Sequence, residues 1–150
     1  ARVRADRVRN DDIYWLNRDV MNAPQAKLWR RFDLLKAAFN RSLFLGLTDF
    51  EGHYAAYPTG GFYQRHKDCF RGDSGRIVSF VLYLNRNWKP EDGGRLRVYA
   101  KNEEGRESYT DINPVGGTMV CFLSGESEHE VLLNHSPRFS LTGWFKRQSV

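Results

Sequence analysis

Three residues of this chain have the types and spacing of metal ligands. His66 and Asp68 form a His-x-Asp pair at the end of the stretch FYQRHKD. Because alternate side chains of a β-strand point to the same face, a strand over this stretch would direct both toward one ion. The best candidate for a third ligand is His129, in the stretch SGESEHEV. Two histidines and one carboxylate on one side of an ion form the facial triad of non-haem Fe(II) oxygenases.

A fourth residue could hold a co-substrate beside such an ion. Arg138 lies nine residues after His129 and could clamp a carboxylate, because its planar guanidinium pairs with both oxygens. The open face of a facial triad can take a bidentate 2-oxo acid and O2. A second, distal carboxylate on the 2-oxo acid would need this counter-charge. Tyr83 and Thr142 could add hydroxyl donors.

Spacing alone leaves other interpretations open. A His-x-Asp pair is common by chance, and a zinc hydrolase could also use two histidines and an aspartate. His129 stands in a charged stretch that could be a surface loop, and Arg138 could face solvent on its strand. We interpret His53 and His135 as residues without a role in the chemistry.

The hydrophobic pattern predicts the elements that would position these residues. Pro24 suits the first turn of a helix, and apolar residues at helical spacing predict an amphipathic helix over 24–41 that packs on a sheet. These apolar residues are Leu28, Phe32, Leu35 and Phe39. A short strand is predicted within 10–17, and further strands near 50–57, 62–68, 76–84, 95–100, 108–112, 118–123, 129–133 and 138–146. About eight short antiparallel strands behind one helix predict a mainly β, cupin-like jelly roll.

The last predicted strand has one apolar face and one polar face. Phe139, Leu141 and Phe145 share the first, and the second carries Arg138, Ser140, Thr142 and Trp144. A barrel packed only for stability would not place an arginine inside. We therefore predict a polar interior that binds a small charged ligand.

Composition narrows the class of protein. A chain of 150 residues fits one domain over 1–150, and its net charge of +5 permits an acidic partner without requiring one. Two cysteines without metal-binding spacing favour a reducing cytoplasm. We expect no membrane span, since no apolar run is long enough. The chain begins with Ala1, so we expect that an N-terminal segment is missing or trimmed.

From about Val8 to Lys146 the chain resembles the prolyl hydroxylases of the Fe(II)/2-oxoglutarate oxygenase superfamily. It is most similar to bacterial relatives of the animal hypoxia-inducible-factor prolyl hydroxylases. The matching stretches are AAYPTGGFYQRHKD, RIVSFVLYLNRNW, DGGRLRVY, INPVGGTMVCFLSGESEHEV and SPRFSLTGWF. They cover most of the chain in the family's order, so the resemblance is specific.

The resemblance implies a double-stranded β-helix with a helix on one sheet, and a role for each candidate residue. Fe(II) would bind His66, Asp68 and His129. The residues implied for 2-oxoglutarate are Arg138, Tyr83 and Thr142, with Tyr57 near the metal end, and those implied for the peptide groove are Arg76 and Trp144. The segment from Arg9 to Asn22 resembles the family's mobile finger loop, which folds over bound substrate.

The implied activity is hydroxylation of a prolyl residue at C4, with conversion of O2 and 2-oxoglutarate to CO2 and succinate. The implied partner is a protein that bears the target proline, among bacterial relatives elongation factor Tu, and ascorbate is the implied reductant. Two alternatives stay open. One is an oxygenase of the same class for a free amino acid or an alkylated nucleic-acid base, although scattered basic residues argue against nucleic acid. The other is a non-catalytic jelly-roll binding module.

Overall fold

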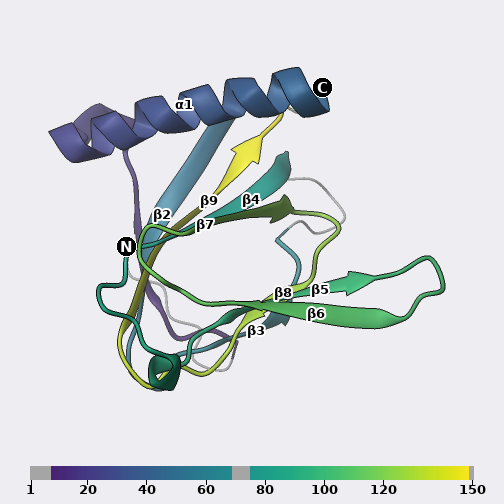
Figure 1. Cartoon of the computed structure of the whole chain (residues 1–150). Helices are drawn as coiled ribbons and strands as arrows, with labels where there is room; N and C mark the ends of the chain where they lie inside the picture. The colour runs from purple at the N-terminus through teal and green to yellow at the C-terminus, as the bar shows by residue number, and fades with distance from the viewer. Residues whose placement is uncertain (1–7, 69–74, 149–150) are drawn as a thin grey trace.

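The structure of the chain is a computed structural model that describes residues 8–68 and 75–148. Cys69 lies outside these ranges. The predicted turn from Arg71 to Gly75 also lies outside them, apart from Gly75 itself. Two antiparallel sheets face each other, and a single long helix lies across the outer side of one of them (Figure 1). Among the described residues, no helix combines the length and the hydrophobicity that a membrane span needs.

Nine strands build the two sheets of the described chain. The five-stranded sheet has the order β1 (Asp12–Trp15), β2 (Asp49–Tyr57), β9 (Arg138–Lys146), β4 (Arg76–Tyr83) and β7 (Met119–Leu123). The four-stranded sheet has the order β3 (Tyr63–His66), β8 (His129–Val131), β5 (Leu96–Lys101) and β6 (Glu107–Ile112). Two 3-10 turns, η1 (Arg18–Val20) and η2 (Pro90–Asp92), complete the elements. The predicted mainly β jelly roll is confirmed.

Helix α1 (Ala23–Leu43) begins where the sequence provides a cap. The Asn22 side chain accepts a hydrogen bond from the backbone N–H of Gln25, and the Gln25 side chain accepts one from the backbone N–H of Asn22. This reciprocal pair satisfies two donors that the first helical turn would otherwise leave unpaired. The helix ends at Leu43, and the capping residue Phe44 has a left-handed backbone with φ of 53°. The predicted helix over 24–41 is thus confirmed and is slightly longer.

The inner face of α1 packs on the apolar side of the five-stranded sheet. Phe32 contacts the rings of Phe50 and Phe80, with ring centroids 5.4 and 4.7 Å away. Gly143 of β9 makes room for this packing, because a Cβ there would lie 2.6 Å from the ring of Phe80 and 2.1 Å from a backbone oxygen. Since strand side chains alternate, the residues between these apolar positions point the other way, into the space between the sheets.

The predicted strand over 62–68 is wrong at its C-terminal end. The strand expected over 62–68 ends at His66, and Asp68 lies in a bend beyond it. The two side chains therefore do not share a strand face. Their proximity comes from the path of the chain after β3, where Asp68 turns toward Ser79 on β4 and accepts a 2.7 Å hydrogen bond from its hydroxyl.

Truncation of the helix–sheet contact should destabilise the protein strongly. Phe32→Ala should lower the free energy of unfolding by about 3–5 kcal/mol, because it removes a buried ring and leaves a cavity. Urea unfolding followed by circular dichroism measures the loss. Leu34→Ala, at a 72% exposed position on the same helix, is the matched control and should change stability by less than about 0.5 kcal/mol. Equal losses in the two variants would contradict this packing.

Candidate metal and co-substrate site

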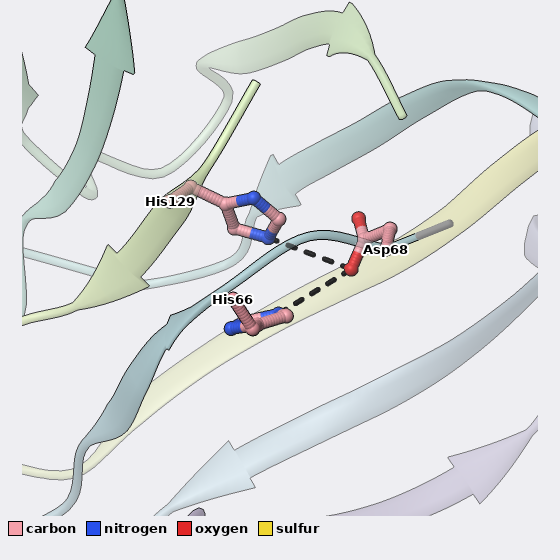
Figure 2. A group of neighbouring side chains, drawn as sticks. All are labelled: His66, Asp68 and His129. Atoms are coloured by element: carbon pink, nitrogen blue, oxygen red, sulfur yellow. Dashed lines mark ion pairs between the residues drawn. The ribbon is translucent and has the colours of Figure 1, made fainter. Parts of the chain in front are cut away.

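Strand pairing brings the two candidate histidines together. His66 at the end of β3 and His129 at the start of β8 are direct partners in the register of the four-stranded sheet. Their ring centroids lie 4.3 Å apart. Asp68 completes the group from the bend after β3, and Figure 2 shows both imidazoles turned toward its carboxylate. One candidate ligand atom from each residue lies within 4.8 Å of the other two.

The distances inside this group suit a shared cation. Oδ1 of Asp68 lies 3.4 Å from Nε2 of His66 and 3.5 Å from Nε2 of His129. The Asp68 and His129 side chains are at most 10% exposed, and that of His66 is 14% exposed. Nε2 of His66 has no hydrogen-bond partner among the described residues. A buried nitrogen with a free lone pair beside a carboxylate fits a metal such as Fe(II).

The surroundings of the three side chains fix their orientation. Nδ1 of His66 donates to the carbonyl of Gln64 at 2.7 Å, which leaves Nε2 as the free acceptor of that ring. The hydroxyl of Ser79 donates to Oδ2 of Asp68, opposite the oxygen that faces the histidines. Burial alone would raise the pKa of Asp68, but the His129 and His66 rings and the Ser79 hydroxyl hold it well below its usual range. Asp68 is therefore an anion at neutral pH.

A cavity of about 130 Å³ opens beside this group, between the two sheets. Of the residues that the sequence singled out, all except Tyr83 line it: His66, Asp68, His129, Arg138, Thr142, Tyr57, Arg76 and Trp144. They come from both sheets and from the bend after β3. The structure thus brings together residues that are up to 87 positions apart, from Tyr57 to Trp144.

Arg138 is a buried cation in the wall of this cavity. It is 3% exposed, and its Nε donates to the carbonyl of Gly94 at 2.8 Å. Its Nη2 has no hydrogen-bond partner, and no carboxylate pairs with it, among the described residues. A buried charge without a partner is costly. The guanidinium therefore fits an anionic ligand, such as the distal carboxylate of 2-oxoglutarate.

Two tyrosines flank this guanidinium. Its Cζ lies 5.2 Å from the ring centres of Tyr57 and of Tyr83. Tyr83 is fully buried behind the cavity wall, and its hydroxyl also has no partner among the described residues. Burial raises the pKa of Tyr83 to about 12, although the Arg138 charge lowers it. The phenol is thus protonated at neutral pH and has a hydroxyl donor without a partner among the described residues.

Arg76 and Trp144, which both line the cavity, are stacked on one another. The Arg76 guanidinium lies 3.5 Å from the centre of the Trp144 ring. Its Nε also donates to Glu51 at 3.0 Å. The stacking and the ion pair hold the arginine beside the cavity, where a polypeptide could contact it.

The structure adds cavity residues that the sequence did not single out. His53, which we interpreted as inert, lines the cavity, as do Arg9 and Tyr63. A signal for His53 was present, because it precedes Tyr57 by an even number of residues on one strand and so shares its face. Arg9 belongs to the segment that resembles a finger loop, and the structure pairs part of this segment, β1, with β2.

A jelly roll that holds two histidines and an aspartate beside a buried arginine has the groups that an iron- and 2-oxo-acid-dependent oxygenase needs. The chain belongs to the 2OG-Fe(II) oxygenase superfamily, whose family model matches residues 52–146. The family implies Fe(II), 2-oxoglutarate and O2 as its reactants and cofactor.

Within the superfamily, the chain is similar to prolyl hydroxylases. It superposes on a Pseudomonas putida prolyl-4-hydroxylase with a TM-score of 0.89 and 46% identity, over 99% of this chain and 78% of that one. A Trichoplax adhaerens prolyl hydroxylase, solved with a peptide fragment of the hypoxia-inducible-factor oxygen degradation domain, gives a TM-score of 0.81 and 30% identity, over 96% and 66% of the two chains.

Animal relatives match over a shorter stretch. Prolyl hydroxylase EGLN3 of Mus musculus is 35% identical over 94 residues, which are 61% of this chain and 38% of the relative. Egl nine homolog 1 of Homo sapiens is 36% identical over 94 residues, 61% of this chain and 21% of the relative. The chain therefore spans well under half the length of these relatives.

Removal of any one of the three grouped side chains should abolish metal binding. His66→Ala, Asp68→Ala and His129→Ala should each lose the Co(II) absorption bands of the wild type, because two ligands hold a divalent ion poorly. The fold should survive, since these side chains border a cavity rather than the packed core. Circular dichroism checks this. His135→Ala removes an exposed histidine and should bind Co(II) as the wild type does. A triad variant that keeps wild-type bands would refute the site.

Proposed function

We propose that this chain is a prolyl 4-hydroxylase that uses Fe(II), O2 and 2-oxoglutarate to modify a protein. The proposal rests on two groups that line the same cavity, one suited to a cation and the other to an anion. A His-Asp-His group offers three ligand atoms to a cation, and the buried Arg138 has no anionic partner among the described residues. A 2-oxo acid with two carboxylates, bound together with iron, satisfies both groups.

Each residue then has a defined task. His66, Asp68 and His129 hold the iron, which supplies the oxygen-activating chemistry when bound. Arg138 pairs with the distal carboxylate of 2-oxoglutarate through charge-assisted hydrogen bonds, and the Tyr83 hydroxyl donates to the same group. Thr142 and Tyr57 also line this cavity. The protein thus contributes the positioning of the reactants.

The class of substrate is inferred from residues of the cavity and from the similar proteins. Arg76 and Trp144, which line the cavity, suit a polypeptide, because the partly exposed guanidinium of Arg76 offers donors. Identity of 46% to a prolyl-4-hydroxylase and of 30% to an enzyme bound to a peptide supports a prolyl residue as the target. We propose elongation factor Tu as the first candidate substrate, cytoplasm as the site of action and ascorbate as the reductant.

The decisive experiment identifies the modified protein. The purified chain is incubated with Fe(II), 2-oxoglutarate, ascorbate and a lysate of its own species, and mass spectrometry then locates prolines that gain one oxygen. We expect such a proline, with succinate formed in step. Asp68→Ala is the inactive control. Succinate formation with oxygen on another residue or on a base would select a different substrate. No succinate at all would favour a non-catalytic binding module.

Arg138 provides a separate test of the co-substrate site. Arg138→Lys keeps the charge but loses the planar fork, so it should misplace the 2-oxo acid at the metal. We expect the KM for 2-oxoglutarate to rise by at least ~10-fold, a loss on the order of 1.4 kcal/mol. Steady-state kinetics with varied 2-oxoglutarate measure it.

The matched control is Arg97→Lys. This arginine pairs with Asp111 on the neighbouring strand, away from the cavity, and its replacement should leave the KM unchanged. The affinity for substrate peptide, measured with metal and co-substrate saturating, should change little in either variant. An unchanged KM in Arg138→Lys would remove the co-substrate assignment.

A further inference from the structure

His53 is a buried imidazole in an unusual setting. It lies in the middle of β2 and is 2% exposed. Trp15 of β1 stands opposite it in the strand register, and its ring centroid is 4.8 Å from that of His53. On the other side the ring of Trp144 lies 5.7 Å away. The imidazole is therefore held between two indoles, and His53 also lines the cavity.

Neither ring nitrogen of His53 has a hydrogen-bond partner among the described residues, and the same holds for Nε1 of Trp144. Native proteins rarely leave buried polar groups without a partner, so each such group calls for an explanation. The other unpartnered atoms of this site are accounted for by the proposed iron and co-substrate: Nε2 of His66, the hydroxyl of Tyr83 and Nη2 of Arg138. The proposed iron and co-substrate do not account for the unpartnered atoms of His53 and Trp144.

The imidazole of His53 is neutral at physiological pH. Burial lowers its pKa to about 4; the positive charges of Arg9 and Arg76 act in the same direction, and the carboxylates of Asp11 and Asp68 act against it. A neutral imidazole has one N–H donor and one acceptor nitrogen. The indole of Trp144 adds a second donor and no acceptor. The two neighbouring side chains both line the cavity and thus have up to two buried N–H groups without a partner among the described residues.

These donors match the polar groups that surround a proline in a polypeptide. Proline has no backbone N–H, so the chain beside its ring presents carbonyl oxygens and no donor of its own at that residue. The part of Trp144 that lines the cavity can contact the apolar ring, while the N–H groups of His53 and Trp144 bind an adjoining carbonyl. A neutral donor suits this uncharged acceptor.

We propose that His53, together with Nε1 of Trp144, forms a binding subsite for the backbone carbonyl next to the target proline. This inference rests on the proposed function and extends it to a residue that positions the substrate. It assigns His53 no part in metal or co-substrate binding. Loss of the hydrogen bond should therefore weaken peptide binding and leave 2-oxoglutarate binding intact.

Two replacements separate hydrogen bonding from packing. His53→Gln keeps a donor and an acceptor at similar reach, whereas His53→Met keeps apolar volume without a donor. The probe is a blocked peptide, alanyl-prolyl-glycyl-alanine, titrated into protein loaded with Zn(II) and a 2-oxoglutarate analogue that cannot be decarboxylated. The readout is the ¹⁵N–¹H signal of the Trp144 indole, whose shift gives a Kd without turnover.

We expect the peptide to shift the Trp144 indole signal saturably in the wild type. The Kd of His53→Gln should stay within about threefold of wild type, and that of His53→Met should rise by at least ~10-fold. Tyr54→Phe, on the opposite face of β2, is the matched control and should bind as the wild type does. Analogue affinity should be equal in all four proteins, which also confirms that each variant is folded.

The outcomes are distinct from those of the proposed function. His53→Met binding as tightly as His53→Gln would show a packing role and overturn the subsite. A wild-type protein whose Trp144 signal does not respond to the peptide would overturn it as well. Either result leaves the proposed function standing if prolines gain oxygen in the lysate experiment. Conversely, the absence of proline oxidation would refute that function even if this peptide binds.

Discussion

The cavity of this protein depends on the burial of one positive charge, that of Arg138. Arg138 stands on a central strand of the larger sheet, where a hydrophobic residue would cost nothing to bury. Its Nε is held by the Gly94 carbonyl, and Gly94 has a positive φ of 69°, with only 3.0 Å between a hypothetical Cβ and the arginine side chain. Any larger residue there would be strained and would crowd the guanidinium. The backbone is thus shaped to present a cation to the cavity.

The alternation of strand side chains separates this polar cavity from the core that holds the fold. On β4 the even-numbered residues Val78 and Phe80 face the helix side, and Val81 and Tyr83 face the space between the sheets. Each central strand therefore contributes to two independent layers. The helix can supply apolar burial on one side while the other side carries ionisable groups. This division explains how a chain of 150 residues accommodates so many buried polar atoms.

Much of this arrangement could be predicted from the sequence, for identifiable reasons. The helix and the strands after it follow from apolar periodicity and from glycine, proline and asparagine at the turns. The inward face of β9 follows from alternation around Arg138. What could not be predicted depends on contacts between distant segments. Asp68 reaches its neighbours from a bend, and periodicity does not describe a bend. His53 acquires its environment only when β1 brings Trp15 against it, and a lone histidine in a strand carries no sign of such a neighbour.

The ligand groups are divided between the two sheets. His66 and His129 belong to the smaller sheet and Arg138 to the larger one, while Asp68 is bonded to Ser79 of the larger sheet. A molecule that contacts both groups cross-links the two halves of the jelly roll. By mass action, anything that binds only the folded chain stabilises it by RT ln(1 + [L]/Kd), about 2.7 kcal/mol at a hundred times Kd. The supply of iron and small dicarboxylates would then set how long the folded protein survives in the cell, and not only how fast it works.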